Sequence, residues 1–245
     1  KSISGIRGTI GGKVDENLTP IDIVESISAY GTWLKYKNRN KKLKIVIGRD
    51  ARISGEMVEN ICIGTLQGLG IDVVNIGLST TPTVEIAVPI EKADAGIIIT
   101  ASHNPREWNA LKLLNNKGEF INAEDGKNLM SIADSNPFID ENINLGSVTF
   151  NDSYIDTHID LILKLPFVDS ESIKRRKFKV VVDAVNSTGG ISIPILLDRL
   201  GVETIKLYCD AGQQRNKRYG PCLNLKGASV NGKIYFKSFG PSNND

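Results

Sequence analysis

A short polar segment could carry chemistry. The sequence Thr-Ala-Ser-His-Asn-Pro at residues 100–105 ends the apolar run that begins at residue 95. Such runs form strands covered on both faces, and open α/β sheets bind ligands beyond the carboxyl ends of their strands. The hydroxyl of Ser102 could be a nucleophile, a phosphate carrier or a hydrogen-bonding group. Asn-Pro also forms ordinary turns, and in such a turn Ser102 and His103 would be loop residues without a chemical role.

Acyl transfer through Ser102 is disfavoured by its surroundings. A serine hydrolase needs a base and an orienting acid, and the sequence contains only two histidines, His103 and His158. His103 is the immediate neighbour of the serine, and no G-x-S-x-G pattern surrounds it. His158 lies beside the apolar face of an expected helix, where packing is the simpler role.

Nucleotide-binding motifs are also missing. No G-x-x-x-x-G-K-[ST] occurs, and the glycine-rich turn at residues 183–190 lacks the G-x-G-x-x-G spacing. This turn could bind phosphate weakly at a helix N-terminus, but a packing turn is the favoured interpretation. The absent fingerprint disfavours an NAD-type Rossmann dehydrogenase.

Three further segments give Ser102 a context. Asn-Ala-Leu-Lys occupies residues 109–112, Ser-Gly-Ile-Arg-Gly occupies residues 4–8, and Gly-Arg-Asp-Ala-Arg-Ile-Ser-Gly occupies residues 48–55. With residues 100–105, they resemble in order and spacing the active-site, opening and G-R-D segments of the α-D-phosphohexomutases. Residues 180–190 resemble the start of that family's second domain. The likeness spans residues 3 to about 208.

The resemblance implies phosphoryl transfer through a phosphoserine. Phospho-Ser102 would donate to a hydroxyl of a hexose phosphate, and the resulting hexose 1,6-bisphosphate would turn over and return its other phosphoryl group. Lys112 and Arg7 would be the cationic and proton-handling residues, and His103 would help to hold the phosphate. Mg²⁺, bound through the phosphate on Ser102, would neutralise charge. The residue types agree, because catalysis here consists of alignment and charge neutralisation.

Other charged residues in these segments have simpler interpretations. Arg49 and Arg52 are expected to order the loop beside the site, and Asp50 is expected to pair with one of them. The alternative for Arg7 is a surface charge in a flexible N-terminal strand.

The resemblance is incomplete. The family's D-G-D-G-D-R metal loop, its sugar-recognition loop and its phosphate-binding loop do not occur in this sequence. The likeness fades at about Ala211, which suggests a truncation or a reading-frame change near residue 210 and an inactive chain. The opening segment favours interconversion of glucosamine 6-phosphate and glucosamine 1-phosphate. The alternatives are a phosphomannomutase/phosphoglucomutase and a non-catalytic sugar-phosphate-binding module.

Helices and strands alternate around these segments. Thr19 and Pro20 are expected to start one helix, Ser54 to cap a second and Thr81 to start a third, with Gly70 in the left-handed position that ends the second. Strands are expected at residues 43–47, 71–76 and 95–100, and a hairpin at residues 111–114 and 119–121.

These elements predict an α/β fold with a mixed, mostly parallel sheet layered between helices. Residues 1–150 form the first domain, with a boundary in the polar segment 134–152. An incomplete second domain of the same type occupies residues 151–210, with strands at 178–183 and 202–208 flanking a helix. Residues 211–245 lose both the helical and the strand period, and the sequence predicts no place for them in this fold.

Composition limits the partners. The 245 residues are 40% hydrophobic, and 30 basic against 28 acidic side chains leave a net charge of +2. We therefore expect no nucleic-acid or membrane partner, and we interpret the basic run at residues 174–177 as a solvated turn. Three irregularly spaced cysteines and no secretory signal predict a cytoplasmic protein. The sequence does not indicate an oligomeric state.

Overall fold

The computed structural model describes residues 5–39, 41–135, 144–211, 226–230 and 233–237. The chain divides into two compact units. The first comprises Lys1–Ala101 and Glu107–Tyr154, and the second comprises Ser102–Arg106 and Ile155–Asp245.

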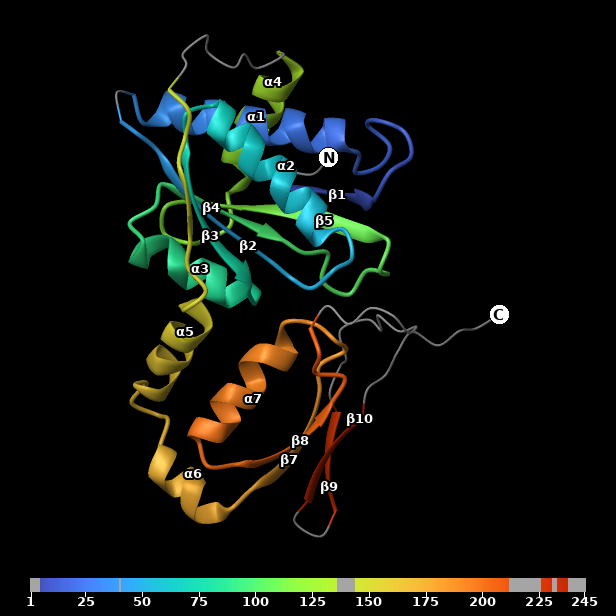
Figure 1. Cartoon of the computed structure of the whole chain (residues 1–245), viewed down its shortest axis with the longest axis vertical. Coiled ribbons are helices and arrows are strands. Elements are labelled where there is room, and N and C mark those ends of the chain that lie inside the picture. The colour runs from blue at the N-terminus through green and yellow to red at the C-terminus, as the bar shows by residue number, and fades with distance from the viewer. Residues whose placement is uncertain (1–4, 40, 136–143, 212–225, 231–232, 238–245) are drawn as a thin grey trace. The chain divides into compact units, whose positions relative to one another are not determined.

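The first unit is built on a six-stranded mixed sheet (Figure 1). Its strands, in spatial order, are β1 (Gly5–Thr9), β5 (Trp108–Leu114), β4 (Ala95–Ile99), β2 (Lys44–Arg49), β3 (Asp72–Leu78) and β6 (Val148–Phe150). The four strands from β4 to β6 run parallel, whereas β5 is antiparallel to both β4 and β1. The expected mixed, mostly parallel sheet is confirmed.

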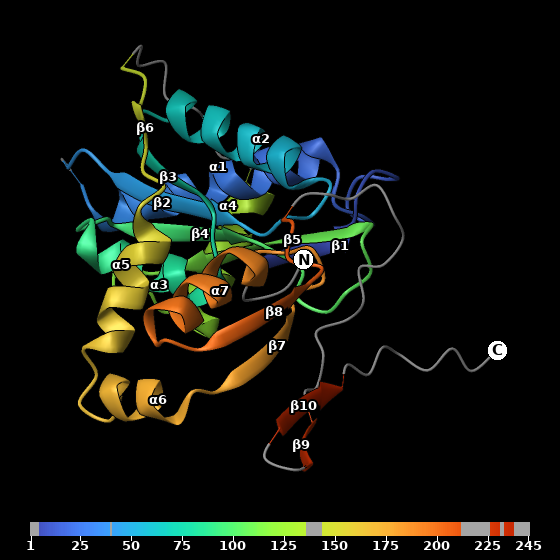
Figure 2. The same cartoon turned by 60° about the horizontal axis from the view of Figure 1, so that its bottom comes forward.

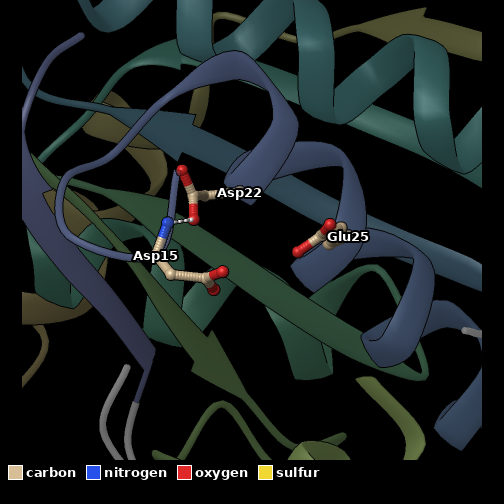
Figure 3. A group of neighbouring side chains, drawn as sticks. All are labelled: Asp15, Asp22 and Glu25. Carbon is tan, nitrogen blue, oxygen red and sulfur yellow. Dashed lines mark hydrogen bonds between the residues drawn. The ribbon is translucent and has the colours of Figure 1, made fainter. Parts of the chain in front are cut away.

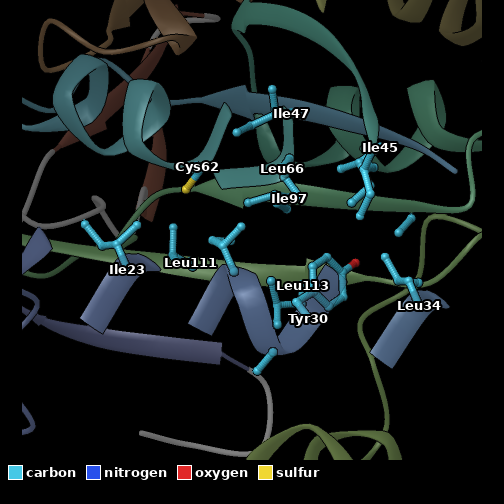
Figure 4. Packing of buried hydrophobic residues seen from close by; sticks show 14 of the residues in the cluster. Ile23, Tyr30, Leu34, Ile45, Ile47, Cys62, Leu66, Ile97, Leu111 and Leu113 are labelled. Atoms are coloured by element: carbon cyan, nitrogen blue, oxygen red, sulfur yellow. The ribbon is translucent and has the colours of Figure 1, made fainter. Parts of the chain in front are cut away.

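Helices cover both faces of this sheet (Figures 1 and 2). One face carries α1 (Pro20–Lys37), α2 (Gly55–Gly68) and α4 (Ala123–Asp134), and the other carries α3 (Thr81–Ile90). In β2, Ile45 and Ile47 enter the larger core while Val46 enters the smaller one, as the alternation of a strand requires. Figure 4 shows Ile45, Ile47 and Ile97 packed in the larger core.

A local signal explains where α1 starts, but the one expected for α2 does not act as a cap. Thr19 caps α1 through a capping box with Asp22, and Pro20 occupies the first turn, as predicted. Ser54 precedes α2 but makes no capping hydrogen bond, so that prediction was wrong. Its Oγ instead accepts a hydrogen bond from Nδ2 of Asn109 at 3.0 Å.

Glycine ends α2 and allows one close approach. Gly70 has a φ of 73°, in the left-handed region expected for it. Gly118 has a φ of 79°, and a Cβ there would lie 1.9 Å from the carbonyl oxygen of Glu85 in α3. Only glycine lets this turn pack against α3.

Two parts of the first unit differ from the sequence predictions. The expected hairpin strand at residues 119–121 is reduced to one bridge, between Leu114 and Phe120, because β1 already pairs with residues 108–112 of β5. The polar segment 134–152 was not expected to contain a strand, but β6 lies within it and pairs with β3. The helix α4 was also not predicted.

The second unit contains the expected strand, helix and strand. These are β7 (Lys179–Asp183), α7 (Gly189–Arg199) and β8 (Glu203–Leu207), with β7 parallel to β8. They follow α5 (Tyr154–Leu163) and α6 (Ser170–Arg176). Farther along the chain, β9 (Lys226–Val230) and β10 (Lys233–Lys237) form an antiparallel pair. The rest of the unplaced tail, residues 212–225, 231–232 and 238–245, lies outside the described residues.

The basic run at residues 174–177 is a helix terminus rather than the predicted turn. Lys174, Arg175 and Arg176 form the last turn of α6, and Lys177 ends it in the left-handed conformation. Positive charge there is favourable because it faces the negative end of the helix dipole. None of the helices in the described ranges has the length and apolarity needed to cross a membrane.

Candidate functional site

Ser102 and His103 lie on an exposed turn that follows β4. Every residue of β4 is buried, so the strand provides a firm base for this turn. Ser102 has a φ of 54°, in the left-handed region that residues other than glycine seldom adopt. Such outliers gather at functional sites, although six other non-glycine residues in the described part of the chain share a positive φ.

Arg7 and Lys112 lie on one face of the sheet, in the neighbouring strands β1 and β5. Arg7 is paired with Ala110, and Lys112 is two residues farther along β5, so both side chains project to the same side. Ile6 and Leu111 project to the opposite side, into the larger core. The register thus brings together the two cations that the sequence had placed far apart.

Lys112 is half-buried, near an aromatic ring and under the influence of a carboxyl group. Its Nζ lies 5.8 Å from the centroid of the Phe120 ring. Burial raises the pKa of Glu85, in α3, and the positive charge of Lys112 opposes that rise. Lys112 therefore acts electrostatically on the α3 side of the sheet.

Asp50 binds the chain directly after β4. Oγ1 of Thr100 donates to its Oδ2 at 2.6 Å. The backbone N–H of Arg52 donates to its Oδ1 at 3.0 Å, and Nε of Arg52 donates to Oδ2 at 3.2 Å. Burial raises the pKa of Asp50, while these hydrogen bonds and the charge of Arg52 oppose the rise. The expectation that Asp50 pairs with one of the two arginines is confirmed for Arg52.

Arg52 binds the first residue of β5. Its Nη1 donates to the carbonyl oxygen of Trp108 at 2.9 Å. Arg49 has a different partner, because its Nε donates to Oε2 of Glu59, in α2, at 3.1 Å. Glu59 was not predicted to take part, and its position on α2 offers no local signal in the sequence. The 49–54 turn therefore contacts both ends of the segment that carries Ser102.

One acidic cluster in the described residues is compact enough to be tested against Mg²⁺. Asp15, Asp22 and Glu25 place one carboxylate oxygen each within 4.8 Å of one another (Figure 3). Asp22 already accepts hydrogen bonds from the backbone N–H groups of Asp15 at 2.9 Å and Thr19 at 3.0 Å, and from the Thr19 hydroxyl. Its carboxylate serves the cap of α1, so this cluster does not fit the magnesium site implied by the resemblance.

Comparison with known proteins decides the family. Residues 2–140 match the family described as phosphoglucomutase/phosphomannomutase, alpha/beta/alpha domain I. The chain belongs to the phosphoglucomutase/phosphomannomutase family. The match covers the buried strand β4, the turn with Ser102, and the strands with Arg7 and Lys112.

Relatives of this phosphoglucomutase/phosphomannomutase family chain are much longer than it is. A phosphoglucomutase/phosphomannomutase of Thermococcus kodakarensis is 36% identical over 202 residues, covering 82% of this chain and 44% of the relative. A phosphoglucosamine mutase of Alkaliphilus oremlandii is 31% identical over 204 residues, covering 82% and 43%. The chain therefore spans less than half the length of these curated relatives.

Solved structures of the family share the fold. A phosphoglucomutase/phosphomannomutase family protein from Burkholderia thailandensis has a TM-score of 0.68 and 25% identity, covering 87% of this chain and 44% of that chain. A putative phosphomannomutase from Thermus thermophilus has a TM-score of 0.70 and 21% identity, covering 86% and 46%. The likeness extends beyond residue 140, since it covers most of this chain.

Proposed function

We propose that this chain carries the phosphoserine part of a phosphohexomutase, which moves a phosphoryl group within a hexose phosphate by way of Ser102. The observation that carries the proposal is the position of Ser102, an exposed residue just beyond the carboxyl end of the buried strand β4. Family membership supports the same reaction class. Ligands of open α/β sheets bind at this end of the strands.

The chain's own residues would act by orientation and charge. The bond between phosphorus and Oγ of Ser102 breaks as a sugar hydroxyl forms a new bond to phosphorus. The proton of that hydroxyl reaches the leaving Oγ of Ser102 through solvent or through Lys112, whose ammonium group gives a proton to Oγ and takes up the sugar proton in exchange. Arg7 and Lys112 offset the negative charge that spreads over the transferring oxygens, and His103 helps to hold the phosphate. The return step reverses these roles with the second phosphoryl group of a hexose 1,6-bisphosphate.

Mg²⁺ is part of the proposal only through the phosphate on Ser102. When bound, it neutralises charge on the transferring phosphoryl group. Mg²⁺ prefers oxygen ligands, but in the Asp15, Asp22 and Glu25 cluster the carboxylate of Asp22 is engaged in the cap of α1.

Interconversion of glucosamine 6-phosphate and glucosamine 1-phosphate is the favoured reaction. It is supported by the phosphoglucosamine mutase of Alkaliphilus oremlandii among the relatives. The phosphoglucomutase/phosphomannomutase of Thermococcus kodakarensis supports the alternative hexose phosphates. A non-catalytic sugar-phosphate-binding module is the second class of function, because the chain covers less than half of either relative. A cytoplasmic location, as expected from the sequence, is part of the proposal.

Phosphate transfer to Ser102 tests the proposal. The full chain is incubated with glucose 1,6-bisphosphate and Mg²⁺, and its intact mass and phosphopeptides are measured. We expect one phosphoryl group on the peptide that contains Ser102, and no gain in Ser102→Ala. Ser153→Ala, which removes an exposed serine elsewhere in the chain, is the matched control and should still gain it.

Phosphate on another residue would contradict Ser102 as the phosphate carrier, and no phosphate in the unmodified chain would contradict a phosphotransferase role. In the second case, calorimetric titration with glucosamine 6-phosphate tests the binding-module alternative.

A further inference from the structure

We propose that Asp50 and Arg52 are positioning residues that fix both stems of the loop at residues 101–107, here called the Ser102 loop. The inference rests on the proposed function, because it concerns how the hydroxyl of Ser102 is presented for phosphoryl transfer. Neither residue needs to touch the phosphate. Their effect is exerted through the backbone on either side of the loop.

The first stem is held by Asp50. Its backbone N–H donates to the carbonyl oxygen of Ile99 at 3.0 Å, and its Oδ2 accepts the 2.6 Å hydrogen bond from Thr100. Thr100 also donates its backbone N–H to the carbonyl oxygen of Ala110 at 3.1 Å. The chain is therefore fixed up to the residue that precedes the Ser102 loop.

The second stem is held by Arg52 and its neighbours. Arg52 donates to the carbonyl oxygen of Trp108, the first residue after the Ser102 loop. Asn109 donates to Ser54, and Ile10 donates its backbone N–H to the carbonyl oxygen of Glu107 at 2.8 Å. The same short turn thus binds both stems.

The contact between Asp50 and Arg52 links the two stems. Their side chains are only 15% and 4% exposed, so water cannot readily replace a lost partner. Removing one member of a buried pair leaves the other uncompensated, which makes such pairs costly to break. The pair's own hydrogen bonds to Thr100 and Trp108 would be lost or weakened at the same time.

Helix α2 contacts the 49–54 turn through Glu59. Glu59 binds Nε of Arg49 at 3.1 Å, and Nη1 of Arg49 donates to the carbonyl oxygen of Asp50 at 3.4 Å. Glu59 is 6% exposed. The turn is thus joined to a helix of the larger core, which limits its movement. Such restraint matters because displacement of a reacting group by about 1 Å can slow a reaction about 100-fold.

Trypsin cleavage after Arg106 tests the positioning role locally, because Arg106 is an exposed residue of the Ser102 loop. We expect Asp50→Asn and Arg52→Lys to accelerate cleavage of the Arg106–Glu107 bond about tenfold or more. Thr100→Val leaves the buried pair intact and removes only one stem contact, so it should accelerate cleavage less. If Asp50→Asn or Arg52→Lys prevents folding, Thr100→Val still tests the inference.

Asp94→Asn is the matched control. Asp94 is a buried carboxylate at the opposite end of β4, where its Oδ2 accepts from the backbone N–H of Lys44 at 3.0 Å and its Oδ1 pairs with Lys41 at 2.5 Å. We expect wild-type cleavage after Arg106 in this variant. Unchanged cleavage in Asp50→Asn, Arg52→Lys and Thr100→Val, or equal acceleration in Asp94→Asn, would overturn the inference.

Phosphate transfer from glucose 1,6-bisphosphate provides the functional readout. We expect the initial rate of Ser102 phosphorylation to fall about tenfold or more in Arg52→Lys, with the same final stoichiometry. An unchanged initial rate beside accelerated cleavage would overturn the positioning role. If the unmodified chain takes up no phosphate, the proposed function fails, and cleavage after Arg106 still decides whether the two residues fix the loop.

Discussion

The strands β4 and β7 have similar apolar sequences but very different surroundings. β4 reads Ala-Gly-Ile-Ile-Ile and is buried at every residue, whereas β7 reads Lys-Val-Val-Val-Asp and buries only Val182. β4 has a hydrogen-bonded strand on each side and cores on both faces. In the described residues β7 pairs with β8 alone. An apolar run thus becomes a rigid support only when neighbouring elements cover it.

This difference matters for function because the candidate site depends on β4. The Ser102 loop starts beyond its carboxyl end, and the residues that bind both stems of the loop belong to the first unit. The corresponding turn after β7 lacks such a well-covered strand. We therefore expect the first unit, which holds both stems of the Ser102 loop, to be the more stable part of the chain.

Hydrogen exchange should show the largest contrast between the two strands. Amides in β4 should exchange only when the first unit opens, whereas amides in β7 should exchange through local opening. We expect rates in β7 to be faster by a factor of about 1,000 or more. Mass spectrometry of peptides from both strands in the full chain measures this. Equal protection would show that the second unit is as well supported as the first.

Shortening one isoleucine in each unit should give a smaller but still clear contrast. Ile97→Ala in β4 removes a fully buried side chain and should lower the free energy of unfolding of the first unit by about 2–5 kcal/mol. Ile205, in β8, is 42% exposed, and Ile205→Ala should leave that free energy unchanged.

Tryptophan fluorescence during urea unfolding measures the free energy of unfolding of the first unit. The two tryptophans of the sequence, Trp33 and Trp108, both lie in the first unit. A loss of stability in Ile205→Ala comparable to that in Ile97→Ala would mean that the two units unfold together.

The pH dependence of stability should give the smallest effect, with opposite signs in the two units. The pKa of Asp50 is raised above its ordinary value of 3.8, mainly by burial, so its contribution to stability is lost as pH rises through the raised pKa. The pKa of Asp169 in the second unit is lowered, mainly by its hydrogen bonds with Ser172, so its contribution is lost as pH falls.

Comparing the wild type with Asp50→Asn isolates the first of these effects. Between about pH 4 and pH 7, the wild type should lose stability in the first unit relative to Asp50→Asn, as followed by tryptophan fluorescence. Asp169→Asn should leave this pH dependence of the first unit as in the wild type. A wild type that gains stability relative to Asp50→Asn over this range would show that Arg52 outweighs burial at Asp50.

Much of the first unit follows from short-range signals in the sequence. The cap at Thr19, the left-handed Gly70 and the apolar runs at β2, β3 and β4 each depend on residues close together in the chain. Such signals also indicated the α/β fold and the turn with Ser102. The helix α4 was missed because its cap at Asn122 and its buried Leu129 occur in a polar segment with little apolar periodicity.

The sequence by itself determined the alternation of helices and strands and the motifs that identify the family. Only the tertiary structure decided that Arg52, rather than Arg49, pairs with Asp50, and that Ser54 binds Asn109 instead of capping α2. It also decided that Arg7 and Lys112 share a face. The last two outcomes depend on strand order and register, which bring together residues more than 50 positions apart and are not encoded in any one local pattern.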